Sequence, residues 1–490
     1  MKSIIIIGAG MGGLAAGIYG QLNGYHTEIY EMHSSPGGQC TSWKRKGYTF
    51  DASIHHLMGC KDGSKINQFW KEIGAMPREM VPQKESISFV DSKGNSFHDY
   101  NDLDELQKHM LVIAPEDRIE IENYVKRIRS FVDKDMMGNI VMDGKKGMIR
   151  LLPTMLKNIK YLNMTLNEYG KNFKNPLLKR AIPLLEYSMP NLPAFIHFAK
   201  HAAGASGDIL WPIGGSGEFS RSIVEKYIAL GGTLNLSNKV TKILTENGKA
   251  IGITLEDGSE HFADIIISNA DGRKTIYDLL DGQYTDSEIE NWAKPGTEKE
   301  TNWGTMVYLG IRRDLSNEPS ALVMLLDEPM TLTGKTINSL EMQIYGFDPS
   351  MAPKGKGTIK VEMVTPFSYW ECDSDKEYQD KKEETAKQVI SILEKYYSGI
   401  TNEVEVIDVV TIKTWERYMG GTRGFANFPN KAFGLGTMLK KGRNTLPRLD
   451  NFYMVGIWVT ATGALFSNAL SGKTAIKDIC KGDGKKFTEM

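Results

Sequence analysis

The feature that most constrains how this chain folds lies in its first thirteen residues. Residues 3–7 form a short, almost wholly apolar run, which is typical of a parallel strand buried on both faces. The next six residues match the pattern GxGxxG, and residues 14–19 then have the composition of a helix. In such a unit the first glycine permits a tight turn, the second lets a pyrophosphate approach the backbone, and the last lets the helix pack on the strand. Because free amides at a helix start bind phosphate, we expect a dinucleotide to contact Gly8, Gly10, Met11, Gly12 and Gly13.

An acidic residue stands where the same motif requires one. A second apolar run, residues 26–30, ends at Glu31, which lies 18 residues beyond Gly13. A carboxylate at this spacing hydrogen-bonds the ribose of the dinucleotide. Two alternatives remain, namely that Glu31 is a solvated acid at a strand end and that the glycines form an ordinary turn. Lys2 and the isoleucines after it also resemble a signal peptide, although the glycine spacing explains this run better.

A glycine pair six residues beyond Glu31 favours a flavin cofactor over a nicotinamide cofactor. Gly37 and Gly38 precede Gln39, and a nicotinamide dehydrogenase does not need two glycines at this place. The stretch from Gly8 to Gly59 resembles the amine oxidase/phytoene desaturase superfamily, in which this loop returns to FAD. Gln39 replaces the arginine of the family pattern, and residues 50–53 replace its Phe-Asp-x-Gly as Phe-Asp-Ala-Ser.

Two later segments are similar to the same superfamily. After Trp211-Pro-Ile-Gly-Gly-Ser-Gly we predict a helix at 218–230, strands at 231–236 and 239–243, a hairpin with turns at 247–248 and 257–258, and a strand at 263–270. The resemblance implies that the backbone at Val240 meets the adenine, the alternative being a purely structural hairpin. Residues 451–473 are similar to the C-terminal flavin motif, which implies contacts from Gly456, Gly463, Ala464 and Leu465. Ile457 stands where relatives often have a polar residue, so a side-chain bond to the ribityl chain is not expected there.

The resemblance implies an α/β fold of the two-dinucleotide-binding-domain flavoprotein type. A discontinuous Rossmann-like FAD-binding domain would comprise residues 1–75, 205–290 and 440–490. Residues 76–204 and 291–439 would form an interleaved α+β substrate domain. The helix after Gly463 would begin beside the isoalloxazine, where its N-terminal dipole stabilises negative charge on the reduced ring. We expect FAD to be bound without a covalent link.

Composition excludes several other classes. The 490 residues carry a net charge of -1, with 41% hydrophobic and 24% charged residues, so disorder is excluded and nucleic-acid binding is not expected. Four well-separated cysteines predict reduced thiols in a cytoplasmic protein and no structural metal. No apolar run reaches the length of a membrane span.

Two apolar segments suggest where lipids bind. Residues 182–203 carry few charges and lie in the region where the carotenoid- and retinoid-enzyme branch binds substrate, so they line either a hydrocarbon tunnel or the domain core. Residues 147–162 predict an amphipathic helix flanked by Arg150, Lys157 and Lys160. Such a helix either lies on a membrane surface or packs on the core.

The resemblance implies flavin chemistry on carbon–carbon bonds of a long polyene or unsaturated lipid such as a carotenoid or retinoid, by desaturation, saturation or isomerisation. His55 and His56 are candidates for the catalytic proton donor or substrate contact, although neighbours in an extended segment point to opposite faces, so that at most one would face the flavin. Arg423 is a candidate at the substrate entrance. No second GxGxxG motif occurs, so electrons would come from or go to a diffusible carrier or a partner protein. The alternatives are a flavin amine or porphyrinogen oxidase and a non-enzymatic lipid-binding protein resembling Rab GDP-dissociation inhibitors.

Overall fold

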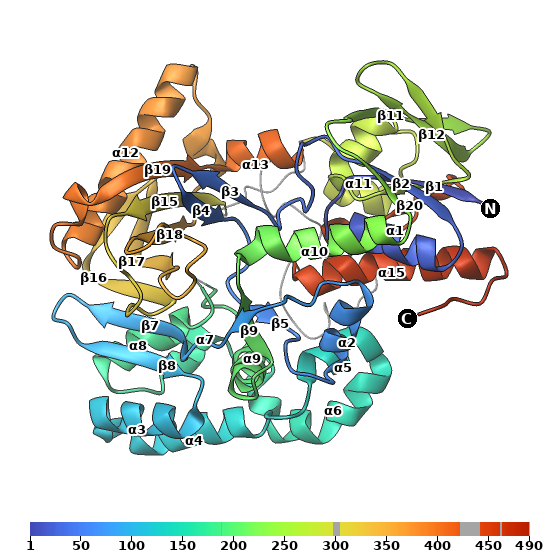
Figure 1. The fold of residues 1–490 in the computed structure, drawn as a ribbon. Helices are drawn as coiled ribbons and strands as arrows, with labels where there is room; N and C mark the ends of the chain where they lie inside the picture. The colour runs from blue at the N-terminus through green and yellow to red at the C-terminus, as the bar shows by residue number, and fades with distance from the viewer. Residues whose placement is uncertain (188, 297–303, 422–441, 461–462, 490) are drawn as a thin grey trace.

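The computed structural model describes residues 1–187, 189–296, 304–421, 442–460 and 463–489. A five-stranded parallel sheet carries the dinucleotide motif (Figure 1), in the order β10-β2-β1-β14-β20. Its strands are β1 (Ser3–Ile7), β2 (His26–Tyr30), β10 (Thr233–Asn235), β14 (Ile265–Ser268) and β20 (Phe452–Met454). The strand order reverses between β1 and β14, and ligands of open α/β sheets bind at the carboxyl ends of strands at such a point. The predicted α/β, Rossmann-like fold is confirmed.

Three helices pack together beside this sheet, namely α1 (Met11–Leu22), α10 (Gly215–Ala229) and α15 (Leu465–Gly482). The helix predicted at 218–230 is therefore found, and it begins three residues earlier. Helices α1 and α15 cross so closely that a Cβ atom added at Gly472 would lie 2.3 Å from the carbonyl oxygen of Gly12. The start of α1 is thus held by the helix that follows the last strand of the sheet.

A small antiparallel sheet covers the opposite side of the parallel sheet. It consists of β11 (Val240–Glu246), β12 (Lys249–Leu255) and β13 (Glu260–Phe262). Its apolar residues pack against Ile5, Ile7 and Ile266, together with α11 (Ser287–Ala293). The predicted hairpin is confirmed, because Asn247 and Gly248 both adopt the positive φ values, 49° and 75°, that a tight two-residue turn requires.

The second large sheet has seven strands in the order β19-β15-β18-β17-β16-β7-β8. All its pairs are antiparallel except β16 with β7. The charged helix α12 (Asp375–Glu394) packs its buried residues on this sheet. The strands are β7 (Glu85–Asp91), β8 (Ser96–Tyr100), β15 (Thr305–Ile311), β16 (Ala321–Leu332), β17 (Lys335–Ile344), β18 (Gly357–Met363) and β19 (Val404–Val410).

A group of helices lies below this sheet in Figure 1 and encloses its own core. Most apolar side chains of residues 182–203, including Phe195 and Phe198, are buried in that core. The core alternative therefore describes these side chains better than the tunnel. The helices are α3 (Leu103–Ile113), α4 (Arg118–Arg129), α5 (Met136–Asp143), α6 (Lys145–Lys157), α7 (Leu166–Gly170), α8 (Pro176–Ala181) and α9 (Ala194–Ala205).

Short elements connect the two large sheets. The strands β5 and β6 both pair with β9, so the chain after Asp51 is joined to the segment before α10. These elements are β3 (Ser42–Arg45), β4 (Tyr48–Asp51), β5 (Leu57–Met58), α2 (Lys65–Glu72), β6 (Met80–Val81), β9 (Ile209–Pro212) and α13 (Ile412–Met419).

Candidate cofactor and substrate site

The GxGxxG segment has the backbone that its glycines were expected to provide. Gly8 has a φ of 94°, which favours glycine, and its amide donates to the carbonyl of Tyr30 at 2.8 Å. A Cβ atom at Gly13 would lie 2.1 Å from the carbonyl oxygen of Gly8, so only glycine allows this strand–helix contact. The first hydrogen bond within α1 runs from Leu14 N to Gly10 O. The amides of Met11, Gly12 and Gly13 therefore have no acceptor within the helix.

Asn269, which sequence reasoning did not select, organises this region. It directly follows β14, and its amide donates to the carbonyl of Ile7 at 2.8 Å. Its side chain lies close to three glycines, Gly10, Gly12 and Gly456. A Cβ atom added at any of them would lie 2.5–2.7 Å from the Asn269 side chain. The predicted strand at 263–270 contained this residue, but no local pattern distinguished it.

Glu31 lies at the end of β2 and is only 8% exposed. Its two carboxylate oxygens accept the amides of Ala9 and His33, each at 2.8 Å. Burial raises its pKa above the usual value, although these amides act in the opposite direction. Its carbonyl accepts the amide of Asn238, two residues before the buried Val240, so the residues predicted to bind the ribose and the adenine lie near one another.

The loop containing Gly37, Gly38 and Gln39 lies against the glycine turn. Gly37 and Gly38 have φ values of 110° and 59°, and the amide of Gly37 donates to the carbonyl of Ala9. A Cβ atom at Gly38 would lie 3.3 Å from the Cα atom of Gly10. The partly buried Gln39 follows at the same edge. The glycine pair therefore allows two backbone segments to approach one another at the dinucleotide motif.

The C-terminal motif reaches the same edge of the sheet. Gly456 follows β20 with a φ of 87°, and its amide donates to Ser471 Oγ at 2.7 Å. Gly463 and Ala464 precede α15, which begins at Leu465 and has no acidic residue in its first turn. The positive end of its dipole is thus not offset by an acid of its own first turn. Trp458 stacks on Trp292 with ring centroids 5.6 Å apart.

These positions fit a dinucleotide cofactor. Gly10, Gly12, Gly13 and Gly456 are places where a Cβ atom would collide with neighbouring atoms, so the backbone is bare at the carboxyl edge of the sheet. A helix start, a buried acid at the end of the second strand and a glycine loop from the C-terminal motif converge there. Such a surface exposes amides to a diphosphate and a carboxylate to a ribose.

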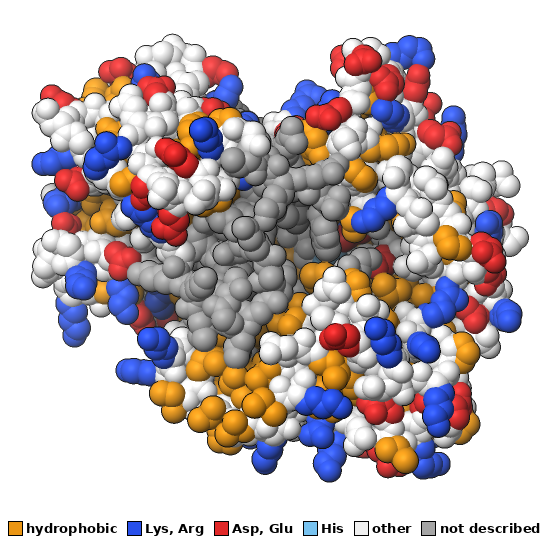
Figure 2. All heavy atoms as spheres, turned by 180° about the vertical axis from the view of Figure 1, so that it is seen from behind, with side chains coloured by type: hydrophobic (Ala, Val, Ile, Leu, Met, Phe, Trp, Pro, Cys, Tyr) orange, Lys and Arg blue, Asp and Glu red, His pale blue; other side chains and the backbone are white. Residues whose placement is uncertain are grey.

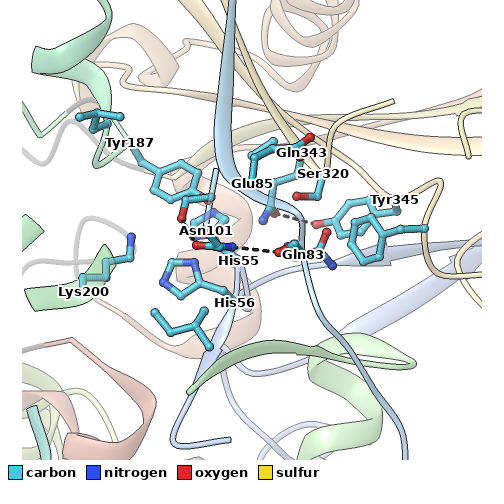
Figure 3. A pocket seen from close by; sticks show the side chains of 15 residues that line it. His55, His56, Gln83, Glu85, Asn101, Tyr187, Lys200, Ser320, Gln343 and Tyr345 are labelled. Carbon is cyan, nitrogen blue, oxygen red and sulfur yellow. Dashed lines mark hydrogen bonds between the residues drawn. The ribbon is translucent and has the colours of Figure 1, made fainter. Parts of the chain in front are cut away.

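A cavity of about 550 Å³, counted with its opening to solvent, lies where the segment after Asp51 meets the seven-stranded sheet. Figure 3 shows His55, His56, Tyr187 and Lys200 toward one side and Gln83, Ser320, Gln343 and Tyr345 toward the other. Both histidines line this cavity. They lie in a bend rather than in an extended strand, so the alternation of side chains does not apply.

His55 is coupled to a buried ion pair. Its Nε2 lies 2.7 Å from Glu362 Oε1, and Lys360 Nζ lies 2.6 Å from the same oxygen. Although burial alone would raise it, the pKa of Glu362 is held well below its usual range by His55 and Lys360. The His55 ring stacks on Tyr187 at 4.6 Å, and Tyr187 has the strained φ of 47°. Burial lowers the pKa of His56, so this ring is neutral near pH 7.

A second polar network reaches the cavity at Lys200. Glu186 accepts Lys200 Nζ at 2.5 Å and contacts His197 Nδ1 at 2.9 Å. Tyr124 lies 2.7 Å from His197 Nε2, and beyond it His201 lies 3.1 Å from Asp99. Sequence reasoning missed this network, and the only local signal was the pair His197 and His201, one helical turn apart on α9. Asp99, His197 and His201 also have the spacing of a metal-ligand group, which sequence reasoning did not predict.

The helix predicted at 147–162 ends earlier, as α6 followed by a short 3₁₀ turn at Ile159–Tyr161. Leu151 and Met155 are buried, whereas Ile149, Leu152, Leu156 and Ile159 are 49–71% exposed. In Figure 2 hydrophobic side chains gather at the lower margin of the molecule, where Figure 1 also places α6. Within the described residues, none of the helices is both long and apolar enough to cross a bilayer.

Arg423, the residue predicted to lie at the substrate entrance, is outside the described residues.

Known proteins resemble the chain over most of its length. Residues 6–73 match the model of an NAD(P)-binding Rossmann-like domain. The chain is 24% identical over 438 residues to a chloroplastic prolycopene isomerase of Arabidopsis thaliana, which covers 86% of this chain and 73% of the isomerase. It is 29% identical over 291 residues to a lycopene-forming phytoene desaturase of Paracoccus, covering 57% and 56% of the two chains.

Solved structures share the fold at low identity. An oxidoreductase from Methanosarcina mazei superposes with a TM-score of 0.63 at 18% identity, over 97% of this chain and 100% of the other. A putrescine oxidase and a Rab GDI from Plasmodium falciparum superpose with TM-scores of 0.59 and 0.54, at 14% and 12% identity, over 98% and 99% of this chain and 99% of each of theirs. These structures show the fold alone, whereas the isomerase and the desaturase match in sequence. The chain is similar in sequence to a prolycopene isomerase and to a phytoene desaturase, and its N-terminal part matches a Rossmann-like dinucleotide-binding domain.

Proposed function

We propose that this protein is an FAD-dependent oxidoreductase that acts on carbon–carbon bonds of a long, conjugated or polyunsaturated hydrophobic molecule. The observation that carries the proposal is the sequence similarity to a prolycopene isomerase over 86% of the chain. The bare glycine backbone at the carboxyl edge of the parallel sheet supports this proposal independently of the sequence similarity. Desaturation, saturation and isomerisation of a polyene are all consistent with this assignment.

The chain's own residues would hold FAD along this edge. The amides of Met11, Gly12 and Gly13 bind the diphosphate, Glu31 binds the ribose, and the backbone at Val240 meets the adenine. The loop of Gly37, Gly38 and Gln39 would approach the dinucleotide, and Gly456, Gly463, Ala464 and Leu465 would lie at the isoalloxazine. We propose that the cofactor domain comprises residues 1–75, 205–290 and 440–490, and the substrate domain residues 76–204 and 291–439.

A bound flavin supplies a hydride acceptor or donor, so the protein mainly needs to orient substrate and exclude water. His55 and His56 are the groups of the chain that would handle a proton at the substrate. Glu362 Oε1 lies 2.7 Å from His55 Nε2 and fixes the orientation of this ring at the cavity. Electrons would be exchanged with a diffusible carrier.

The test is an anaerobic stopped-flow experiment on the FAD-loaded protein. We expect the flavin absorbance near 450 nm to respond to polyenes or unsaturated lipids and not to putrescine or amino acids. A rapid response to small amines with none to any lipid would establish an amine oxidase instead. A colourless protein that binds no added FAD would establish the non-enzymatic lipid carrier.

We further propose that α6 places the enzyme on an anionic membrane surface, from which a hydrophobic substrate could be extracted. Its exposed apolar residues are flanked by Arg150, Lys157 and Lys160. Apolar residues that insert at an interface, combined with cations that face lipid phosphates, are typical of peripheral membrane helices.

A further inference from the structure

A buried group of three metal-ligating side chains lies outside both the dinucleotide motif and the cavity beside His55. Asp99 comes from β8, and His197 and His201 come from successive turns of α9. One ligating atom of each residue lies within 4.8 Å of the other two, and the three residues are at most 3% exposed. Ligands of a zinc ion lie about 2.0–2.2 Å from it, so atoms at this spacing need only small side-chain shifts to share one ion.

Hydrogen bonds fix a proton on the outer nitrogen of each histidine. His201 Nε2 lies 3.0 Å from the carbonyl oxygen of Tyr100, which can only accept, so this nitrogen donates. His197 Nδ1 lies 2.9 Å from Glu186, which is an ionised acceptor because its other oxygen accepts Lys200 Nζ at 2.5 Å. The neutral rings therefore carry their lone pairs on His201 Nδ1 and His197 Nε2. Outer hydrogen bonds to a carbonyl and to a carboxylate are typical of histidines that ligate a metal.

Asp99 is a buried carboxylate next to one of these lone pairs. Its Oδ2 lies 3.1 Å from His201 Nδ1, yet neither atom makes a hydrogen bond of acceptable geometry within the described part of the chain. Two lone pairs at this distance repel one another unless a cation lies between them, and buried charges in proteins are paired or coordinate metals. A second proton on His201 would supply the charge without involving His197, whereas a metal ion would bind all three residues.

The hydroxyl of Tyr124 can serve the site with or without an ion. It lies 2.7 Å from His197 Nε2 and 3.4 Å from Asp99 Oδ1. Without an ion the hydroxyl donates to His197. With an ion on Nε2 it can turn to Asp99 Oδ1, the oxygen that does not face His201, and a hydrogen bond of this kind orients a ligating carboxylate.

The types of ligand select the class of ion. Two imidazole nitrogens and one carboxylate suit divalent first-row transition metals, whereas calcium and magnesium prefer oxygen ligands. Zinc has no geometric preference from its d electrons, so it accepts an arrangement that the protein imposes. Zinc is therefore the probe of choice for this site.

We infer that Asp99, His197 and His201 bind a divalent transition-metal ion such as Zn²⁺, which fastens α9 to β8 at the edge of the seven-stranded sheet. His197 is joined through Glu186 to Lys200, which lines the cavity beside His55, so the ion would also hold this wall of the cavity in place. The inference does not depend on the chemistry proposed for the flavin.

The test is the metal content of the FAD-loaded protein, produced in zinc-supplemented medium and dialysed against metal-free buffer. We expect inductively coupled plasma mass spectrometry to find about one zinc ion per chain. Protein from zinc-depleted medium should unfold at a lower temperature and recover when Zn²⁺ is added, because an ion that binds the folded state stabilises it. A wild-type protein that retains no transition metal, with an unfolding temperature that does not respond to Zn²⁺, would overturn the inference and leave an ion pair between Asp99 and protonated His201.

Two variants locate the ion. Asp99→Asn removes the charged ligand and His201→Phe removes an imidazole, so each should lose most of the bound zinc. His26→Phe, which replaces an exposed histidine beside Glu28, is the matched control and should keep it. Full zinc content in either folded variant would show that the ion binds elsewhere and would contradict the assignment.

A third variant covers the case in which both ligand variants unfold. Glu186→Gln keeps all three ligands and changes only the acceptor at His197 Nδ1. It should weaken zinc binding about tenfold to hundredfold, which is the usual contribution of a group that orients a ligating histidine. An unchanged zinc affinity in this variant would contradict the role of His197 as a ligand.

Discussion

At the scale of single residues, the sequence predicts residues of a local motif better than it predicts residues of a long-range hydrogen-bond network. The glycines of the first turn and Glu31 belong to a pattern only 24 residues long, so their spacing specifies their places. Asn269 contacts Gly8 across 261 positions of sequence, and Glu362 contacts His55 across 307. Such pairs depend on how the sheets pack and leave no periodic signal. The surroundings of His55 were therefore less predictable than the dinucleotide motif.

Glu31→Ala should weaken FAD binding. We propose that the carboxylate accepts ribose hydroxyls, and it also accepts the amides of Ala9 and His33. A charge-assisted hydrogen bond contributes about 1.5–3 kcal/mol, which corresponds to about a tenfold to hundredfold loss of affinity. Titration of FAD into the cofactor-free variant measures the loss. Glu28→Ala, on the same strand and partly exposed, is the control, and full FAD occupancy after dialysis of the Glu31 variant would show that Glu31 is not a ligand.

Glu186 should make the stability of the protein sensitive to acid. Its pKa falls from the ordinary 4.5 to about 2, because Lys200 and His197 outweigh the effect of burial. A carboxyl whose folded pKa is lowered contributes stability above its unfolded pKa, and this stability is lost as the pH falls through the folded pKa. The difference of about 2.5 pH units, at about 1.36 kcal/mol each, gives up to about 3 kcal/mol lost between pH 4.5 and 2.

Urea unfolding at several pH values checks this expectation. The wild-type free energy of unfolding should fall over that range, and Glu186→Gln should flatten the decline while lowering stability at pH 7. The control Glu218→Gln removes an exposed acid that pairs with Arg221 and should leave the decline unchanged. Identical acid profiles for wild type and Glu186→Gln would contradict the assignment.

At the scale of elements, local periodicity was sufficient where an element has one exposed and one buried face. Helix α10 and the β11–β12 hairpin were predicted with near-correct bounds for this reason. Residues 182–203 could not be resolved in this way, because a tunnel wall and a core both require apolar side chains. The parallel pairing of β16 with β7, which joins Leu322 to Ser88, is likewise a long-range contact without a local pattern.

The crossing of α1 and α15 should tolerate no side chain at its closest point. In Gly472→Ala the new methyl group would lie 2.3 Å from the Gly12 carbonyl oxygen and 2.6 Å from Ala16 N. Overpacking of this kind costs about 1–3 kcal/mol, and it would also shift the start of α1, where the diphosphate is proposed to bind. Gly482→Ala, in the same helix with no atom within 4 Å, should be neutral or stabilising by about 0.5 kcal/mol. Thermal unfolding and FAD content of the two variants would be compared, and equal values would show that the crossing can relax.

Helix α6 should bind anionic vesicles. Neutralising Arg150, Lys157 and Lys160 to glutamine should weaken sedimentation with phosphatidylserine vesicles, since each cation contributes about 1 kcal/mol. Leu152→Ser with Leu156→Ser should weaken it further and at all salt concentrations, because the apolar part is not screened. Ile228→Ser, which changes a 54% exposed residue on α10, is the control. A wild-type protein that ignores vesicles even at low salt would rule out this surface.

At the scale of the whole molecule, the parallel sheet is assembled from distant parts of the chain. Strands β1 and β2 come from the first 30 residues, β10 and β14 from residues 233–268, and β20 from residues 452–454. The proposed FAD contacts are distributed over the same three parts. A ligand bound by all of them stabilises their association, because it binds the folded state and not the unfolded chain.

Removal of FAD should therefore destabilise the whole protein reversibly. We expect acid precipitation to release the yellow colour into the supernatant, since no residue of the four motifs is an evident covalent attachment point. The cofactor-free protein should unfold at a lower temperature, and FAD at a hundredfold excess over its Kd should restore about 2.7 kcal/mol. Glu31→Ala should need a proportionally higher FAD concentration for the same recovery, whereas Glu28→Ala should match the wild type. Colour that remains in the precipitate would show a covalent link, and an unfolding temperature that does not respond to FAD would show that the three segments associate without the cofactor.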